Sequence, residues 1–390
     1  MFPKYLPYYL VALALVLSAP SVNLCFDVIE TQSRKRVRAA SSSEDSDDDS
    51  DARRGGRRKF DQTIIKYEWF NNWDGVAGTR DETLTPWNLS DFFENFRGTE
   101  LNIAKIVESK RSWQMDGRGD PVSALEDLIR SKLTRLRLAG IISDEGYHPY
   151  RRISQAIKAS KTLEELELSP PMEYLIDEMD VEHLKKAIAG NTVLKKLSIM
   201  KPIGFNSMKT FFNEGLRMNR HLTFLHLSFQ KFLGRYGTNP LEQLAEALQQ
   251  IETLETLVLS FCEFQTGSFL VAIEAIIKET KLKRLNMQGS TLEDVDATDN
   301  GFNDMLGGGA WGSLEIVELA DIGLSSLDIN SLRYLFFNRN LKRLDLRNNF
   351  LGQSLAVQIN QYLPQHITVD LRGNEDIKPS IPGKKENLII

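Results

Sequence analysis

Cysteine is nearly absent from this chain of 390 residues, which contains only Cys25 and Cys262. Two separated thiols can form neither a disulfide framework nor a cysteine-based zinc site. Histidine is also scarce, and none of the five residues stands at a metal-binding spacing such as H-E-x-x-H. These absences exclude a disulfide-stapled fold and the usual zinc centres.

A large excess of charge of one sign is missing as well. The 48 basic and 53 acidic side chains leave a net charge of -5, so we do not expect nucleic acid to be a partner. With 42% hydrophobic and 26% charged residues, the composition is that of a globular chain with one large or two ordinary domains.

The one long apolar run lies at the N-terminus. Lys4 precedes apolar residues from Leu10 to Leu17, and small residues follow up to Ser21. This pattern predicts a signal peptide over residues 1–21, with an uncleaved signal anchor as the alternative. No other segment approaches the roughly 18 apolar residues of a membrane span, so we expect none after cleavage.

Residues 22–59 form a leader of alternating charge that cannot build a core, and we expect it to be disordered. Its two basic clusters are Arg34, Lys35, Arg36 and Arg38, then Arg57, Arg58 and Lys59. Three interpretations stay open: a solvated linker, a bipartite nuclear-import signal, or a phosphorylation-tunable tract. The last rests on Ser41 and Ser42, which each precede an acidic residue by three positions.

An internal repeat runs through the rest of the chain, in the frame L-x-x-L-x-L. Copies begin at Leu133, Leu163, Leu194, Leu222, Leu254, Leu282, Leu314 and Leu341, and a worn ninth copy begins at His366. After each copy the hydrophobic pattern changes from period 2 to a helical period, as in Leu241, Leu244 and Leu248 behind the capping pair Asn239-Pro240. Each unit is therefore predicted to be a strand followed by a helix.

Residues 131–375 resemble leucine-rich repeats of the ribonuclease-inhibitor type. Two units complete the longer consensus, with Cys262 and Asn349 at its Cys/Asn position. The resemblance implies an α/β horseshoe solenoid of about nine repeats, with a parallel sheet on the concave side, helices on the convex side and a role in protein binding. It also implies that Cys262 and Asn349 satisfy backbone groups inside a turn.

The flanking segments complete the predicted organisation. We expect residues 60–130 to be a helical N-terminal cap, because their aromatic residues suit a core, and residues 376–390 to be a C-terminal tail. The aromatic residues are Trp69, Phe70, Trp73, Trp87, Phe92, Phe93, Phe96 and Trp113.

The leader is similar in layout to translocated effectors of plant-pathogenic oomycetes, which carry RxLR and dEER motifs. Lys35-Arg36-Val37-Arg38 stands in the place of RxLR, and Asp45 to Arg54 in the place of the acidic element. Neither motif is intact, so the resemblance implies a secreted module behind a leader and no translocation mechanism.

Motifs for catalysis are missing. The run Gly307-Gly308-Gly309 lacks the Lys-Ser/Thr of a phosphate-binding loop, and no G-x-S-x-G occurs. We therefore predict that the chain is not an enzyme and uses no cofactor, metal or small-molecule substrate.

The pleat of the strands predicts a candidate protein-binding surface on the concave side. Residues next to the last two consensus leucines face that side, where the outer rows carry charges that can neutralise one another. The central rows form a partly apolar patch of Met200, Phe224, His226, Thr256 and Val258, flanked by Lys196 and Arg284. Two alternatives remain: the surface is a ladder of ion pairs that binds nothing, or the patch packs under a loop from Phe229 to Thr238.

Two functions are compatible with these features. The first is a secreted effector, a virulence factor that acts in the host cell or host nucleus and binds a host protein to interfere with defence. The second is an intracellular or nuclear adaptor that acts in its own cell. A receptor ectodomain is disfavoured, because the sequence has no second hydrophobic span and no capping cysteine cluster.

Overall fold

A computed structural model describes the chain over residues 66–70, 77–78, 99–108, 121–138, 141–143, 149–169, 178–200, 202–233, 239–292, 303, 306 and 311–390. The predicted signal peptide and leader lie outside the described residues. So do both basic clusters and the Lys35-Arg36-Val37-Arg38 element.

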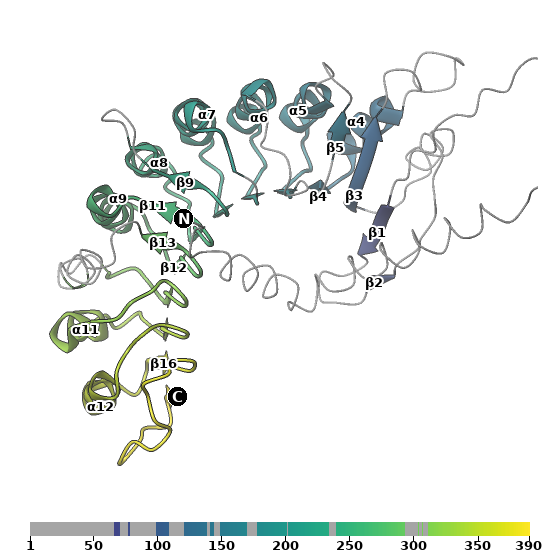
Figure 1. The fold of residues 1–390 in the computed structure, drawn as a ribbon. Coiled ribbons are helices and arrows are strands. Elements are labelled where there is room, and N and C mark those ends of the chain that lie inside the picture. Colours follow the sequence, from purple (N-terminus) through teal and green to yellow (C-terminus); the bar gives the residue numbers. More distant parts are fainter. Residues whose placement is uncertain are drawn as a thin grey trace, which may run out of the picture. The chain divides into compact units, whose positions relative to one another are not determined.

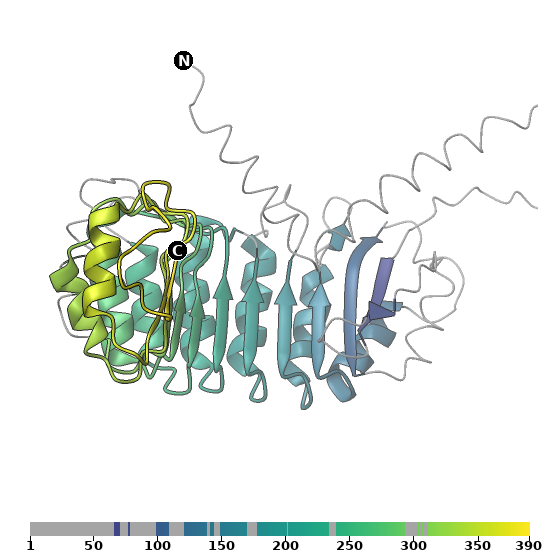
Figure 2. The same cartoon turned by 90° about the horizontal axis from the view of Figure 1, so that it is seen from below.

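A single sheet of 14 strands dominates the described residues, and 11 of its strands follow one another in parallel. Figure 2 shows many of these strands side by side. In order they are β3 (Glu100–Glu108), β4 (Arg135–Leu138), β6 (Glu165–Leu168), β7 (Lys196–Ile199), β8 (Phe224–Leu227), β10 (Thr256–Val258), β12 (Arg284–Asn286), β14 (Ile316–Glu318), β15 (Arg343–Asp345), β16 (Thr368–Asp370) and β17 (Leu388–Ile389).

Helices alternate with these strands and lie on one side of the sheet (Figure 1). They are α4 (Pro121–Ser131), α5 (Pro149–Ala159), α6 (Glu178–Gly190), α7 (Phe205–Thr210), α8 (Pro240–Leu248), α9 (Thr266–Glu279), α11 (Ile329–Phe336) and α12 (Gln353–Tyr362). A π-helical turn, Phe211–Gly215, and a 3-10 turn, Leu216–Met218, extend α7. The result is a solenoid-like α/β fold, as the alternation of periods predicts.

A second sheet of three short parallel strands lies where the chain leaves the large sheet. Its strands are β9 (Lys231–Phe232), β11 (Glu263–Phe264) and β13 (Thr291–Leu292). Phe232 and Phe264 are fully buried and stack with ring centroids 5.3 Å apart. These strands therefore extend the core beyond the consensus positions.

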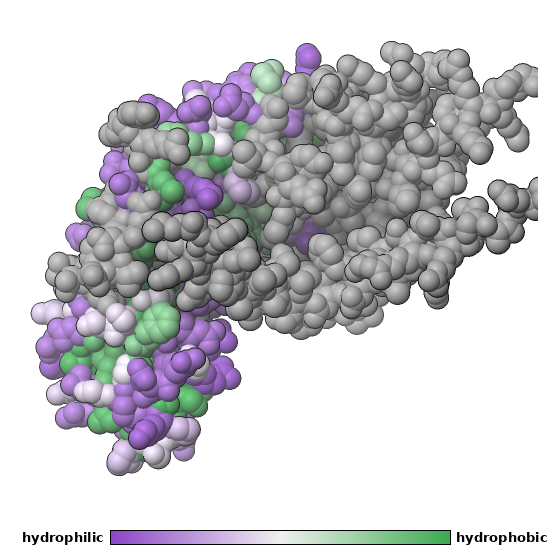
Figure 3. Space-filling view, in the orientation of Figure 1, coloured by the Kyte–Doolittle hydropathy of each residue, from purple (hydrophilic) through white to green (hydrophobic). Residues whose placement is uncertain are grey.

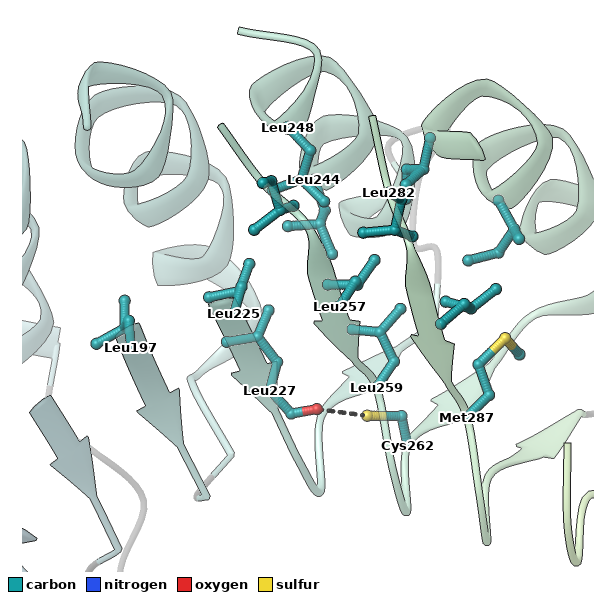
Figure 4. Packing of buried hydrophobic residues seen from close by; sticks show 14 of the residues in the cluster. Leu197, Leu225, Leu227, Leu244, Leu248, Leu257, Leu259, Cys262, Leu282 and Met287 are labelled. Carbon is teal, nitrogen blue, oxygen red and sulfur yellow. Dashed lines mark hydrogen bonds between the residues drawn. The ribbon is translucent and has the colours of Figure 1, made fainter. Parts of the chain in front are cut away.

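The core lies between the large sheet and the helices and is built from the consensus positions. The three consensus residues of each of the eight complete L-x-x-L-x-L copies are at most 2% exposed. Figure 4 shows Leu225 and Leu257 on neighbouring strands, with Leu244 of α8 on the helix side of the same core. In the worn copy the prediction is wrong at one position, because His366 is exposed and its neighbour Ile367 is buried instead.

The two residues at the Cys/Asn consensus position lie inside turns, as predicted. The Cys262 thiol donates to the carbonyl of Leu227 at 3.3 Å (Figure 4). The Asn349 amide donates to the carbonyls of Leu319 and Leu346 and accepts from the backbone N–H of Leu324. A polar side chain at this position satisfies backbone groups that the turn would otherwise leave buried and unpaired.

Helix ends also follow the sequence. The Asn239 side chain accepts from the Leu241 N–H at 2.9 Å, with Pro240 in the first turn of α8. Helix α6 ends at Gly190. These capping residues set the start of α8 and the end of α6.

The flanks of the repeats differ from expectation. Within residues 60–130 the structure describes strands β1 (Lys66–Phe70), β2 (Ala77–Gly78) and β3 as well as α4, so a purely helical cap is wrong for the described part. Strand β1 pairs antiparallel with β3 and with β2, while β5 (Ile141–Ser143) pairs in parallel with β3. Residues 376–390 are more than a tail, because β17 extends the sheet and Leu388 is fully buried.

Candidate functional site

The candidate surface is the face of the large sheet opposite the helices, which we call the open face. Its residues follow the predicted register: Arg135, Glu165, Lys196, Phe224, Thr256, Arg284, Ile316, Arg343 and Thr368 pair in sequence across neighbouring strands. They alternate along each strand with buried consensus residues, and in β4, β6 and β8 the alternation is complete. The open face is thus a set of aligned rows, one from each strand.

Ion pairs connect the first three rows. Arg135 lies 2.9 Å from Glu165, and Arg137 lies 2.8 Å from Glu167. Burial raises the pKa of the Glu167 carboxyl, and the Arg137 charge opposes this shift. Lys196, which we predicted to flank the patch, pairs with Glu165 at 2.6 Å. The predicted neutralisation is confirmed here and reaches one row further than expected.

The central rows carry the predicted patch of Met200, Phe224, His226, Thr256 and Val258. Phe224 and His226 are half-buried, and their rings meet edge to face with centroids 6.4 Å apart. Met200 and Thr256 are also half-buried, whereas Val258 is only 8% exposed. The central patch therefore exposes mainly Phe224, His226, Thr256 and Met200 to solvent, whereas Val258 is buried.

A small polar cluster supports the imidazole of His226. Its Nε2 lies 2.5 Å from the Ser228 hydroxyl and 3.3 Å from the Ser260 hydroxyl, and the two hydroxyls lie 2.9 Å apart. Burial lowers the pKa of His226 to about 4, so the ring is neutral at pH 7. Among the described residues no carboxylate binds the imidazole, and both serines are buried. The cluster orients the ring and lacks the acidic partner of a hydrolytic triad.

An aromatic pair follows strands β8 and β10 of the patch, and the sequence analysis named only one of its members, Phe229, as the start of a possible covering loop. Phe229 and Phe261 stack with centroids 5.4 Å apart and 12° between ring planes. Both have positive φ, 59° and 55°, which is uncommon for bulky residues. In four other repeats the same position holds Gly289, Asp321, Asn348 and Gly373, also at positive φ. The signal in the sequence was an aromatic residue at a position where the four later repeats have Gly, Asp or Asn.

Gly289 occupies the equivalent position in the next repeat and lies against the ring of Phe261. A Cβ at Gly289 would lie 2.4 Å from the ring of Phe261, and φ there is +68°. A side chain at this position would push the ring away. The aromatic pair is therefore packed against backbone on one side.

The last rows are dominated by Arg–carboxylate pairs. Arg284 binds Glu318 through two nitrogens, at 2.9 and 3.0 Å. Glu318, Asp345 and Asp370 are aligned in register on three neighbouring strands. Arg343 and Arg347 contact Asp345, and Arg372 contacts Asp370. The predicted pairing of the outer rows is confirmed, and Arg284 belongs to this network as well as to the rim of the patch.

Sites for other ligands do not stand out in the described part of the chain. There, no group of three or more His, Cys, Asp or Glu side chains is arranged to hold a metal ion. No described helix is both long enough and apolar enough to cross a membrane. Burial raises the pKa of the Cys262 thiol to about 12, so this cysteine is not a reactive nucleophile.

Comparisons with known proteins give no family. Neither a protein-family model nor a curated protein sequence matches the chain. Among solved structures it is similar to a crystal structure of a Bacteroides fragilis protein, with 14% sequence identity and a TM-score of 0.40. That match covers 67% of this chain and 70% of the other. A TM-score this low supports no statement about function.

Proposed function

We propose that the chain is a protein-binding module: a leucine-rich-repeat horseshoe of about nine repeats whose concave side is the open face. The observation that carries the proposal is the contrast along this face. Rows on both sides of the central patch are tied by ion pairs, such as Arg135–Glu165 and Arg284–Glu318. The patch between them offers apolar and aromatic surface, which is the composition of an interface centre inside a charged rim.

The aromatic pair supports this assignment. Residues with positive φ cost free energy unless they are Gly, Asn or Asp. Phe229 and Phe261 occupy such positions without being among the fully buried residues. These half-buried rings add little to the hydrophobic core, and contact with a partner would account for their presence at strained positions. We therefore include Phe229 and Phe261 in the proposed interface with Phe224 and His226.

Features of the N-terminal sequence support a proposal for the cellular role. An apolar run with the shape of a signal peptide and a basic-acidic leader precede the repeats. We propose that the protein is secreted as an effector and binds a host protein, inside the host cell or its nucleus, to interfere with defence. N-terminal sequencing of protein from culture medium tests this: a start near Val22 supports secretion, and retention of Met1 inside the producing cell supports the adaptor function instead.

Affinity capture tests the binding function directly. The full-length protein is immobilised, incubated with host extract, and compared with Phe224→Ala and with Phe337→Ala. Phe337 is a matched control because it is 71% exposed and follows helix α11, on the other side of the sheet. A protein retained by the wild type and by Phe337→Ala, but lost with Phe224→Ala, identifies a partner of the central patch. Equal retention by all three would reject the patch.

A further inference from the structure

Four arginines lie together on the open face at its C-terminal end. Arg284, Arg343, Arg347 and Arg372, which we call the arginine row, come from β12, β15 and the residues directly after β15 and β16. Their side chains are 33–56% exposed, whereas those of the carboxylates beneath them are 11% exposed at Glu318 and 2% at Asp345 and Asp370. Solvent therefore meets guanidinium groups and not the acids that hold them. Figure 3 shows hydrophilic residues predominating around this end of the chain.

The carboxylates hold the arginines in fixed positions. Arg372 donates to both oxygens of Asp370, at 3.0 and 2.7 Å. Arg347 donates to both oxygens of Asp345 and lies 3.6 Å from Asp370, so it bridges two strands. An arginine that is already ordered loses less side-chain entropy when it binds a ligand.

Donors remain on these guanidinium groups. A guanidinium carries five N–H donors. Within the described part of the chain Arg343 donates through Nη2 alone, at 3.2 Å to Asp345. Arg284 uses Nε and Nη2 on Glu318. The row thus combines arginines that are held in place with directed donors that their carboxylates leave unused.

We propose that the arginine row binds a short acidic segment of a protein partner through its Asp or Glu carboxylates. Planar guanidinium groups recognise carboxylates through paired hydrogen bonds. The row spans four neighbouring strands, β12, β14, β15 and β16, which at about 4.8 Å per strand gives about 14 Å. An extended peptide covers this distance with about four residues. The inference rests on the proposed protein-binding function in taking the partner to be a protein.

The same features argue against a nucleic acid as the ligand. Nucleic-acid affinity comes mostly from neutralising many phosphates and releasing their counterions. Here the three carboxylates cancel most of the charge of the four arginines. The residues between the arginines, Ile316 and Ala320, offer no aromatic ring on which a base could stack. Local, directional recognition of a few carboxylates fits this surface better.

Fluorescence anisotropy with the full-length protein tests the proposal. The probe is a labelled peptide of about twelve residues with four central glutamates, and the comparison peptide has glutamines instead. The acidic peptide is expected to bind at low ionic strength and to lose affinity with added salt, while the glutamine peptide binds at least about tenfold more weakly. Equal binding of the two peptides, or no binding of the acidic one, would overturn the proposal. Tighter binding of a single-stranded oligonucleotide that competes with the peptide would also overturn it.

Variants locate the site. Arg343→Gln removes one charge and leaves Asp345 paired with Arg347, so the fold should persist. We expect Arg343→Gln to lower the affinity for the acidic peptide by about threefold to tenfold. Lys342→Gln is the control, because it also removes one positive charge but Lys342 pairs with Glu315 outside the row. The affinity of this variant for the acidic peptide should equal that of the wild type. Equal loss in both variants would mean that net charge alone attracts the peptide, and would reject the site.

The central patch is independent of this test. Phe224→Ala should leave binding of the acidic peptide unchanged, because Phe224 lies two strands from Arg284. Loss of peptide binding in Arg343→Gln would therefore support the row even if capture through the patch fails. Conversely, normal binding of the acidic peptide by Arg343→Gln would reject the arginine row, even if a partner is captured through Phe224.

Discussion

The ring of Phe229 stacks on the ring of Phe261, although each ring extends from a backbone position with positive φ. The stack contributes about 0.5–1.5 kcal/mol beyond the apolar area that it buries, and a left-handed residue with a Cβ costs about 1–2 kcal/mol. Backbone strain therefore offsets much of the gain from stacking, which favours a role in binding over a role in the core.

Phe229→Gly separates these two roles. Glycine relieves the backbone strain while the stacking contact is lost, so the free energy of unfolding should change by no more than about 1 kcal/mol. Phe264→Ala, in a fully buried ring of the neighbouring layer, should instead cost about 3–5 kcal/mol. Urea denaturation measures both. A loss of several kcal/mol in Phe229→Gly would make the stack part of the core.

Leu257→Ala tests the repeat register. Leu257 is fully buried in the centre of the sheet, and a cavity there should cost about 2–5 kcal/mol. Glu255 is exposed and pairs with Lys283, so Glu255→Ala should cost less than about 1 kcal/mol. Thermal unfolding of the two variants compares them. Similar shifts would place Leu257 outside the core.

The stability of the fold should depend on pH through His226. Its pKa is about 4 when folded and about 6.5 when unfolded, so the unfolded chain takes up the proton first as the pH falls. Stability is full above pH 6.5 and decreases between pH 6.5 and 4, by up to about 3 kcal/mol from this residue.

Comparison with His226→Gln isolates this effect, because glutamine does not titrate. Denaturation curves at pH 7 and pH 5 should show a smaller loss of stability in His226→Gln than in the wild type. An identical pH dependence in both proteins would show that His226 titrates normally in the folded state.

The leader makes a separate prediction that concerns residues outside the described structure. Residues 22–59 fused to a fluorescent protein in a eukaryotic cell should accumulate in the nucleus if the two basic clusters act together. Replacing Arg57, Arg58 and Lys59 with alanine should disperse the signal. Confocal microscopy gives the ratio of nuclear to cytoplasmic fluorescence, and uniform distribution of the unmutated fusion would favour the solvated-linker interpretation.

The repeats were predictable because a fixed period ties every leucine to one environment. Leu225, Leu257 and Leu285 pair across adjacent strands as the frame requires. The first and last strands of the parallel run were missed because their copies lack the first leucine. Strand β3 keeps Leu101 and Ile103 but has Gly98 at that position, and β17 keeps Leu388 and Ile390 but has Lys385 there.

The site was predictable only in part. Alternation along a strand places Phe224 and His226 on the open face. This alternation does not predict that Lys196 pairs with Glu165, or that Arg347 lies close to carboxylates on two strands. Long side chains choose among several partners within reach, and that choice depends on three-dimensional packing. The repeated Asp-Leu-Arg at 345–347 and 370–372 was the available signal.

The affinity of a captured partner for Phe224→Ala tests the central claim most directly. Isothermal titration calorimetry on the wild type, Phe224→Ala and Phe337→Ala should show a loss of at least about 1 kcal/mol for Phe224→Ala alone. The melting temperature of Phe224→Ala should stay close to that of the wild type, because its ring is half-buried. Equal affinities of Phe224→Ala and wild type would contradict the proposed interface.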